Sequence, residues 1–228
     1  MECVYKKQYD EGYYSGHIVN GQRSGLGSMV HDNGQIYEGN WVNDEANGMG
    51  KLILPSGRTY IGNFVDDQMY GQGQLTWANG DIYIGNFAND QMSGQGQFTW
   101  ASGAVYIGNF VDGIKCGQGK CTFIETGNTY IGNFMNDKMN GYGKFVSANG
   151  VYEGEFKNNK RHGQGEFTFM DTFYRGEFED NEKSGRGIFT SHDGLVYDGE
   201  WVSDVYIKSK TNIYKADDVK MSLPPIII

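Results

Sequence analysis

Residues 60–64 read Tyr-Ile-Gly-Asn-Phe, and after a short polar stretch Gly71 and Gly73 form a Gly-x-Gly motif. The pattern, Tyr-x-Gly-x-aromatic and then Gly-x-Gly, recurs every 22 to 24 residues, with Ile18 replacing the aromatic residue in the first copy. The nine anchor tyrosines are Tyr14, Tyr37, Tyr60, Tyr83, Tyr106, Tyr130, Tyr152, Tyr174 and Tyr197. A period of this length indicates an array of repeated units, each of which buries its apolar face against its neighbours.

The opening residues of each repeat predict a β-strand. We number each repeat from its tyrosine, at position 0. Positions 0, 2 and 4 then lie on one face of a strand, because successive side chains alternate between faces. The position 2 glycines, such as Gly62, Gly85 and Gly108, leave space between two large side chains. A helix is disfavoured, since each glycine would cost it about 1 kcal/mol.

The rest of the repeat predicts a hairpin. Positions 5 to 9 are polar and rich in Asn and Asp, which tolerate the left-handed backbone of a tight turn. Gly-x-Gly follows at positions 11 and 13, then a large residue at position 15, such as Leu75, and a turn such as Asn79-Gly80. Each closing strand can pair with the opening strand of the next repeat. The predicted fold is therefore all-β, an elongated single antiparallel sheet of stacked hairpin repeats of about 23 residues.

The repeat boundaries predict the domain organisation. Residues 1–13 form an N-terminal cap, residues 14–201 form eight full repeats and a terminal half, and residues 202–228 form a C-terminal cap or extension. Because exposed sheet edges invite pairing with other chains, we expect a covering strand before the array and one or two after it. The apolar residues 223–228 have two interpretations, a lid over the last repeat or an assembly segment that docks on a partner or a second copy.

Composition narrows the class of protein. The formal net charge is −9, which opposes nonspecific binding to nucleic acids and anionic lipids. Aromatic residues make up 14% of the chain, whereas disordered proteins are poor in them. No apolar run approaches the roughly 20 residues of a transmembrane helix, and the first ten residues lack a signal peptide's apolar stretch. The sequence therefore predicts a cytoplasmic protein that does not bind nucleic acid.

No motif points to a metal, a cofactor or a catalytic centre. Cys116 and Cys121 have C-x4-C spacing, but Cys121 occupies the apolar position 15, and Cys3 and His162 stand elsewhere in the repeat pattern. The Gly-x-Gly motifs lack the following helix and the Gly-Lys-Ser/Thr sequence of phosphate loops. The Asn/Asp loops lack the ligand pattern of an EF-hand. We therefore expect a protein without enzymatic activity.

Positions 1 and 3 face away from the tyrosines and carry the candidate partner-binding residues. In consecutive repeats they form a column of isoleucines and a ladder of asparagines. The residues are Ile61, Ile84, Ile107 and Ile131, with Asn63, Asn86, Asn109 and Asn133. Two interpretations remain open. The rows are either a consequence of self-packing or recent duplication, or they form an exposed stripe that binds a partner.

The motif resembles the MORN repeat (membrane occupation and recognition nexus), and the resemblance extends from Tyr14 to Trp201. It implies elongated, twisted antiparallel sheets with a shallow groove. MORN arrays occur in ciliary radial spoke heads, parasite cytoskeletal scaffolds, proteins that hold membranes together and retinophilin-like adaptors of class III myosin. They also occur attached to a phosphoinositide kinase or a lysine methyltransferase. The resemblance therefore implies the fold more firmly than a function.

The expected function is a non-enzymatic scaffold or adaptor that binds protein partners along its β-ribbon. The family implies a cytoskeletal or axonemal setting, as in a radial spoke, and a homodimer is an open alternative. One alternative function is phosphoinositide binding at a membrane surface through Lys157, Lys160, Arg161 and His162. That basic group is diluted by the acidic residues Glu153, Glu155 and Glu166. A second alternative is a regulatory partner of a separately encoded enzyme.

Overall fold

The computed structural model describes residues 1–207 and 212–215, which contain 20 β-strands and no helix. The strands form an open antiparallel sheet of successive hairpins, which confirms the predicted fold class. The chain divides into two compact units, Met1–Glu125 and Thr126–Ile228, and each is described by itself below.

Most strands are seven to ten residues long, and they follow the repeat pattern. The strands of the first unit are β1 Glu2–Tyr9, β2 Gly12–Val19, β3 Gln22–His31, β4 Ile36–Val42, β5 Glu45–Ile53, β6 Thr59–Val65, β7 Gln68–Thr76, β8 Ile82–Ala88, β9 Gln91–Thr99, β10 Val105–Val111 and β11 Ile114–Phe123. Those of the second unit are β12 Asn128–Met135, β13 Lys138–Ser147, β14 Gly150–Lys157, β15 Lys160–Phe169, β16 Thr172–Glu179, β17 Glu182–Thr190, β18 Leu195–Val202, β19 Val205–Tyr206 and β20 Asn212–Lys215.

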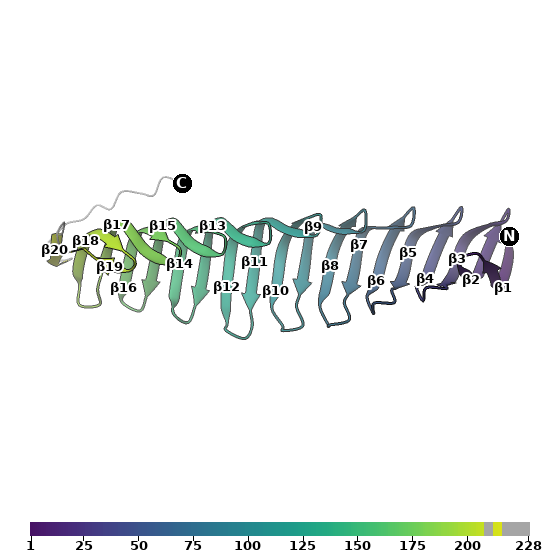
Figure 1. Cartoon of the computed structure of the whole chain (residues 1–228), viewed down its shortest axis with the longest axis horizontal. Helices are drawn as coiled ribbons and strands as arrows, with labels where there is room; N and C mark the ends of the chain where they lie inside the picture. Colours follow the sequence, from purple (N-terminus) through teal and green to yellow (C-terminus); the bar gives the residue numbers. More distant parts are fainter. Residues whose placement is uncertain (208–211, 216–228) are drawn as a thin grey trace. The chain divides into compact units, whose positions relative to one another are not determined.

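Each repeat is one hairpin that pairs with the next. In the first unit β6 pairs with β7 within a repeat, and β7 pairs with β8 of the following repeat (Figure 1). The turn residues Asp66 and Asp67 both have positive φ, 49° and 66°, as a tight two-residue hairpin turn requires. The predicted pairing of closing and opening strands is therefore confirmed.

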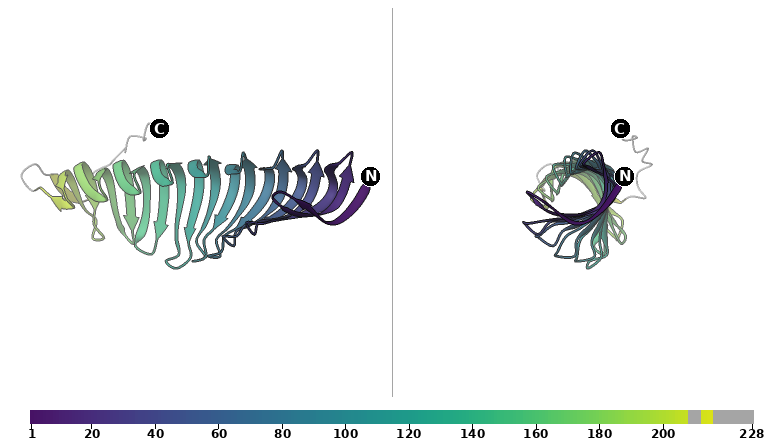
Figure 2. Two further views of the ribbon diagram at one scale, coloured as in Figure 1. Left: turned by 45° about the vertical axis from the view of Figure 1, so that its right-hand side comes forward. Right: turned by 90° about the vertical axis from the view of Figure 1, so that its right-hand side faces the viewer.

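A bulge interrupts each hairpin at the first glycine of Gly-x-Gly. Gly62 pairs with Gly73 and Phe64 with Met69, so the strand of Met69 has extra residues between these two pairs. Gly71 lies in that stretch with φ of 65°, a conformation that glycine adopts without strain. Bulges bend a strand, and the strands within each unit are visibly curved (Figure 2).

The core of each unit lies on the side of positions 0, 4 and 15, which we call the tyrosine face. Tyr60 and Phe64 are almost fully buried, and their rings meet edge-to-face at 5.1 Å between centroids. Tyr60 also meets Phe87 of the next repeat at 4.9 Å, and its hydroxyl donates a hydrogen bond of 2.9 Å to the Asn63 carbonyl. A Cβ atom at Gly73 would overlap the Tyr60 ring. The glycines thus form a channel for the tyrosine ring itself.

The strands predicted at both ends of the array are present. β1 pairs antiparallel with β2, ahead of the first full repeat. At the other end both β19 and β20 pair with β18, β19 at Trp201 and Val202 and β20 at residues 195–198. Residues 223–228, with their two interpretations, lie outside the described part of the chain.

Candidate functional site

The hairpin turns form a clamp between neighbouring repeats. The position 7 amide donates a hydrogen bond of 3.0–3.2 Å to the position 9 carbonyl of the preceding repeat. The position 7 side-chain oxygen accepts one of 2.6–2.9 Å from the amide of the same position 9 residue. The pairs are Asp44 with Arg23, Asp67 with Ala46, Asp90 with Met69, Asn159 with Met139, Asn181 with Arg161 and Asp204 with Lys183. The sequence indicates position 7 only as a turn residue. In the structure this residue also connects neighbouring repeats through hydrogen bonds.

The clamp predicts opposite effects for two substitutions in the first unit. Asp90→Gly should lower the free energy of unfolding by about 1 kcal/mol, because the Met69 amide loses its acceptor. Gly113 stands at position 7 of the next repeat with φ of 79°, and its backbone amide already bonds the Met92 carbonyl. Gly113→Asp should add the missing acceptor and raise stability by a similar amount. Urea denaturation checks both, and two changes of the same sign would contradict the clamp.

Position 9 supplies side chains of different chemistry to the tyrosine face. Three repeats have methionine there, whereas four have a cation. The methionines are Met69, Met92 and Met139, and the cations are Arg23, Lys115, Arg161 and Lys183. Each cation lies over aromatic rings, as when Lys183 lies 5.0 Å from the Trp201 ring and Lys115 lies 4.9 Å from Trp100. Such contacts stabilise a partly desolvated cation.

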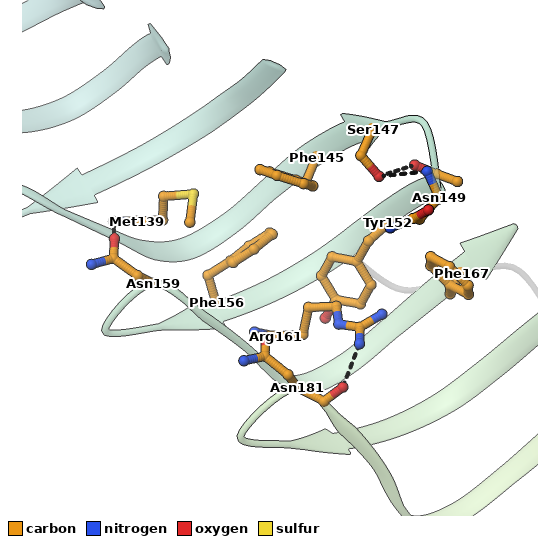
Figure 3. A pocket seen from close by; sticks show the side chains of 11 residues that line it. Met139, Phe145, Ser147, Asn149, Tyr152, Phe156, Asn159, Arg161, Phe167 and Asn181 are labelled. Atoms are coloured by element: carbon orange, nitrogen blue, oxygen red, sulfur yellow. Dashed lines mark hydrogen bonds between the residues drawn. The ribbon is translucent and has the colours of Figure 1, made fainter. Parts of the chain in front are cut away.

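The second unit has a cavity of about 290 Å³ on this face (Figure 3). Strands β13, β14 and β15 line it, and Arg161 reaches past Tyr152 toward the turn residue Asn181. Its apolar lining consists of Met139, Phe145, Tyr152, Phe156 and Phe167. Its polar lining consists of Ser147, Asn149, Asn159, Arg161 and Asn181.

A similar cavity of about 230 Å³ lies in the first unit. Arg23, Tyr37 and Trp41 line it, and the residues at the equivalent places of the second cavity are Met139, Tyr152 and Phe156. Arg161 has the place that Ala46 occupies in the first cavity. Its turn residues are Asp44 and Asp67, where the second cavity has Asn159 and Asn181. The two cavities are thus one repeated site with different charge.

The opposite side of each sheet, which we call the isoleucine face, carries the predicted stripe. Ile61, Ile84, Ile107 and Ile131 have exposed fractions of 47%, 49%, 49% and 51%. They do not form a continuous apolar row, because a polar residue of the intervening strand separates neighbours. Gln74, for example, pairs with both Ile61 and Ile84.

The predicted asparagine ladder is hydrogen-bonded. The Asn63 and Asn86 amides donate to the carbonyls of Gln72 and Gln95, each at 3.3 Å, and Asn133 donates to the Tyr142 carbonyl at 3.4 Å. Between repeats, Gln95 donates to the Asn109 side-chain oxygen at 2.7 Å. Position 12 is therefore a second member of the ladder, which position 3 alone does not indicate.

The predicted basic group is divided between the two faces. Arg161 lines the tyrosine-face cavity, whereas Lys160, the preceding residue on β15, makes an ion pair with Asp180 at 3.0 Å. The hydrogen bond and charge of Lys160 hold the pKa of Asp180 below its usual range, with smaller contributions from His162 and Lys157. The four residues therefore do not converge on one anion.

The described residues contain no cluster of three or more potential metal ligands. Cys121 is buried in its apolar position, Cys116 is half-buried and Cys3 is exposed. Burial raises the pKa of the Cys121 thiol, which keeps it protonated at neutral pH. In the described part of the chain, no helix has the length and apolar character needed to cross a bilayer.

Comparisons with solved structures give only weak similarities. The TCP domain of SAS-4 (dCPAP) from Drosophila melanogaster has a TM-score of 0.42 and 13% identity, over 76% of this chain and 89% of that one. A mutant TCP10 domain of Danio rerio CPAP has a TM-score of 0.35 and 16% identity, over 83% and 99%. Neither similarity is close enough to bear on function. A comparison with curated protein sequences finds no match.

The family comparison is decisive. The MORN repeat model matches eight segments that together span most of the chain, and no enzyme family is found. The segments are residues 14–36, 37–57, 60–82, 83–105, 106–124, 130–151, 152–171 and 174–196. They begin at the tyrosines whose rings lie over the glycines, and the family is typically non-catalytic. The chain therefore belongs to the MORN repeat family.

Proposed function

We propose that the protein is a non-catalytic scaffold that binds an extended segment of a partner protein along the tyrosine face. The observation that carries this proposal is the repetition of one cavity, built around an anchor tyrosine and its aromatic neighbour, at equivalent positions in both units. Enzyme sites are usually few per protein and built from unique residues, whereas repeated subsites suit a repeated ligand such as a polypeptide.

The dimensions of the repeat fit a polypeptide that crosses the strands. Neighbouring strands lie about 4.8 Å apart, so one two-strand repeat advances about 10 Å. A polyproline II segment advances about 3.1 Å per residue with three residues per turn, so every third side chain would meet an equivalent position within a unit. Side chains such as Met92 and Phe98, which are half-buried, provide apolar contacts. An apolar or aromatic residue every third position is therefore the expected signature of the partner segment.

The isoleucine face is a second candidate surface, since its isoleucines are about half exposed. Exposed apolar side chains repeated along a sheet are typical of an interface, although the intervening glutamines make this surface more polar. A partner bound here would contact Ile84 and Asn86, whereas one on the tyrosine face would contact Met92.

Site-specific photo-crosslinking can identify the partner and the face. A photoreactive residue at Met92 or Met139 should capture a partner in cells, and one at Ile84 or Ile131 should not. The captured protein is then purified and its affinity measured by calorimetry. Met92→Glu should weaken binding at least tenfold through the cost of desolvating a charge, and Ile84→Glu less than twofold. Melting temperatures of the variants control for folding.

The other outcomes have distinct meanings. Crosslinks and loss of affinity confined to Ile84 and Ile131 would transfer binding to the isoleucine face. Flotation with phosphoinositide vesicles, without any captured protein, would support the membrane alternative instead. A captured enzyme whose activity changes on binding would support a regulatory role. We also propose a cytoplasmic, cytoskeletal or axonemal setting, which imaging of the endogenously tagged protein tests directly.

A further inference from the structure

Two arginines of the tyrosine face have the same position and nearly the same hydrogen bonds. The Arg23 amide donates to Asp44 Oδ1 at 2.8 Å, and its Nη2 donates to the Asp44 carbonyl at 2.9 Å. The Arg161 amide donates to Asn181 Oδ1 at 2.9 Å, and its Nη2 donates to the Asn181 carbonyl. Arg23 therefore serves as an internal reference for Arg161.

The two guanidinium groups differ in their counter-charge. Arg23 makes ion pairs with Asp44 and Glu11, each at 3.2 Å. Lys183, a third cation at this position, lies 3.7 Å from Asp204. Arg161 instead faces the neutral Asn181, and within residues 1–207 and 212–215 it has no ion pair.

Arg161 is also partly removed from water. Its guanidinium lies 5.2 Å from the Phe167 and Phe178 ring centroids and 5.7 Å from that of Tyr152. Desolvation lowers the pKa of Arg161, and the main opposing influence is the charge of Asp204, which is itself paired with Lys183. A desolvated cation without a counter-ion is costly, and the apolar cavity beside it gives a ligand access.

We propose that Arg161 and its cavity recognise the carboxylate of an Asp or Glu side chain in the partner segment, next to an apolar residue of that segment. This inference rests on the proposed scaffold function and adds the chemistry of one subsite. Nη2 carries two hydrogens, so with one of them bonded to Asn181 the other still forms, together with Nη1 or Nε, the fork that a carboxylate accepts in two parallel hydrogen bonds. The apolar neighbour would occupy the space between Phe145 and Phe167.

The charge balance favours a carboxylate over a phosphate. Among the residues that the structure describes, Arg161 is the one cation that lines this cavity, and Lys160 on the same strand is paired with Asp180. A single guanidinium matches a single negative charge, whereas a phosphate group, with a charge near −2, is usually held by several cations. The formal net charge of −9 further opposes a dianion.

The chain supplies its own matched substitutions. Arg161→Met installs the residue found at this position in Met69, Met92 and Met139, so the sheet should tolerate it. Asn181→Asp recreates the Arg23–Asp44 arrangement and should neutralise Arg161 from within the chain. Lys160→Met removes a charge from the neighbouring residue and serves as the control. All three should melt within a few degrees of the parent protein.

Peptide display on the full chain tests the proposal. Selection from a random 16-residue library should enrich peptides with Asp or Glu beside an apolar residue. A synthetic copy of an enriched peptide should bind Arg161→Met and Asn181→Asp at least tenfold more weakly, and Lys160→Met within twofold. Replacing the acidic residue of the peptide by Gln or Asn should also weaken binding to the parent protein at least tenfold. The same replacement should weaken binding to Arg161→Met less than twofold. This thermodynamic cycle isolates the carboxylate–Arg161 contact.

The failures are distinguishable. If no peptide of any kind is enriched and no partner is captured, the scaffold function fails. If peptides bind on the tyrosine face but show no acidic preference, or lose nothing on Arg161→Met, the carboxylate site alone is wrong. If inorganic phosphate or phosphoinositide vesicles displace the peptide in an Arg161-dependent way, while acetate does not, the site is a phosphate site and the proposal is overturned.

Discussion

Gly85→Val is expected to destabilise the first unit by on the order of 1–3 kcal/mol, as overpacked sites usually do. A Cβ atom at residue 85 would lie 2.5 Å from the Tyr83 hydroxyl oxygen and 2.6 Å from the Gly96 Cα. The second contact is with backbone, so no rotamer change relieves it. The first would displace a hydroxyl that donates to the Asn86 carbonyl at 2.9 Å.

The matched control is Gln91→Ala in the next strand, where an exposed side chain is removed. Its cost should stay below about 0.5 kcal/mol, as at most surface positions. Urea denaturation of both variants measures the difference. Gly108→Val should repeat the large effect one repeat further along, where the Tyr106 hydroxyl is similarly close. Equal midpoints for the valine and alanine variants would show that the glycine channel does not constrain the fold.

The protein is also expected to unfold cooperatively in alkali between about pH 10 and pH 12. Burial raises the pKa of five anchor tyrosines from the ordinary 10.0 to about 12, and it raises the pKa of Tyr152 and Tyr174 still further. The five are Tyr14, Tyr37, Tyr60, Tyr83 and Tyr130. Because the folded state holds these protons more tightly than the unfolded chain, the stabilisation is complete below pH 10. It is lost progressively as the pH rises from 10 through 12.

Phenolate absorbance near 295 nm and the circular dichroism of the strands provide the measurement. The absorbance change of the buried tyrosines should coincide with the loss of strand signal in one transition. Stepwise ionisation of these tyrosines in a folded sheet would contradict their position in a desolvated core. A rise in stability above pH 10 would contradict the direction of the linkage.

The local pattern of residues within each repeat was sufficient to predict the fold. Parity placed Tyr60, Gly62 and Phe64 on one face, and they are buried together. The Asn and Asp residues at positions 6 and 7 indicated the turns, and the strands at both ends followed from the need to cover sheet edges. These features depend on contacts between residues that are close in sequence or related by the repeat.

The candidate site was harder to predict from the sequence than the fold, because it depends on contacts between residues of different repeats. Arg161 was grouped with its sequence neighbours, although consecutive residues of a strand point to opposite faces. Comparing position 9 across all repeats would have separated it from Lys160. The prediction of the isoleucine column missed the glutamines between its members. Strand pairing places Gln74 between Ile61 and Ile84, and the spacing of the isoleucines alone does not show this. The scaffold function and the stripe remain predictions.

In the clamp between turns, each repeat depends on an acceptor from the following repeat. This order bears on how the chain folds during synthesis. The Met69 amide donates to the carboxylate of Asp90, which lies 21 residues later in the chain. A repeat that leaves the ribosome therefore has no partner for this amide until the following hairpin has also emerged. Within each unit, nascent repeats should become protected in order, one repeat behind elongation. The half repeat and the residues just after it complete the last full repeat. The Lys183 amide donates to Asp204 Oδ1 at 2.9 Å, and the Trp201 indole donates to the Gly187 carbonyl at 3.1 Å.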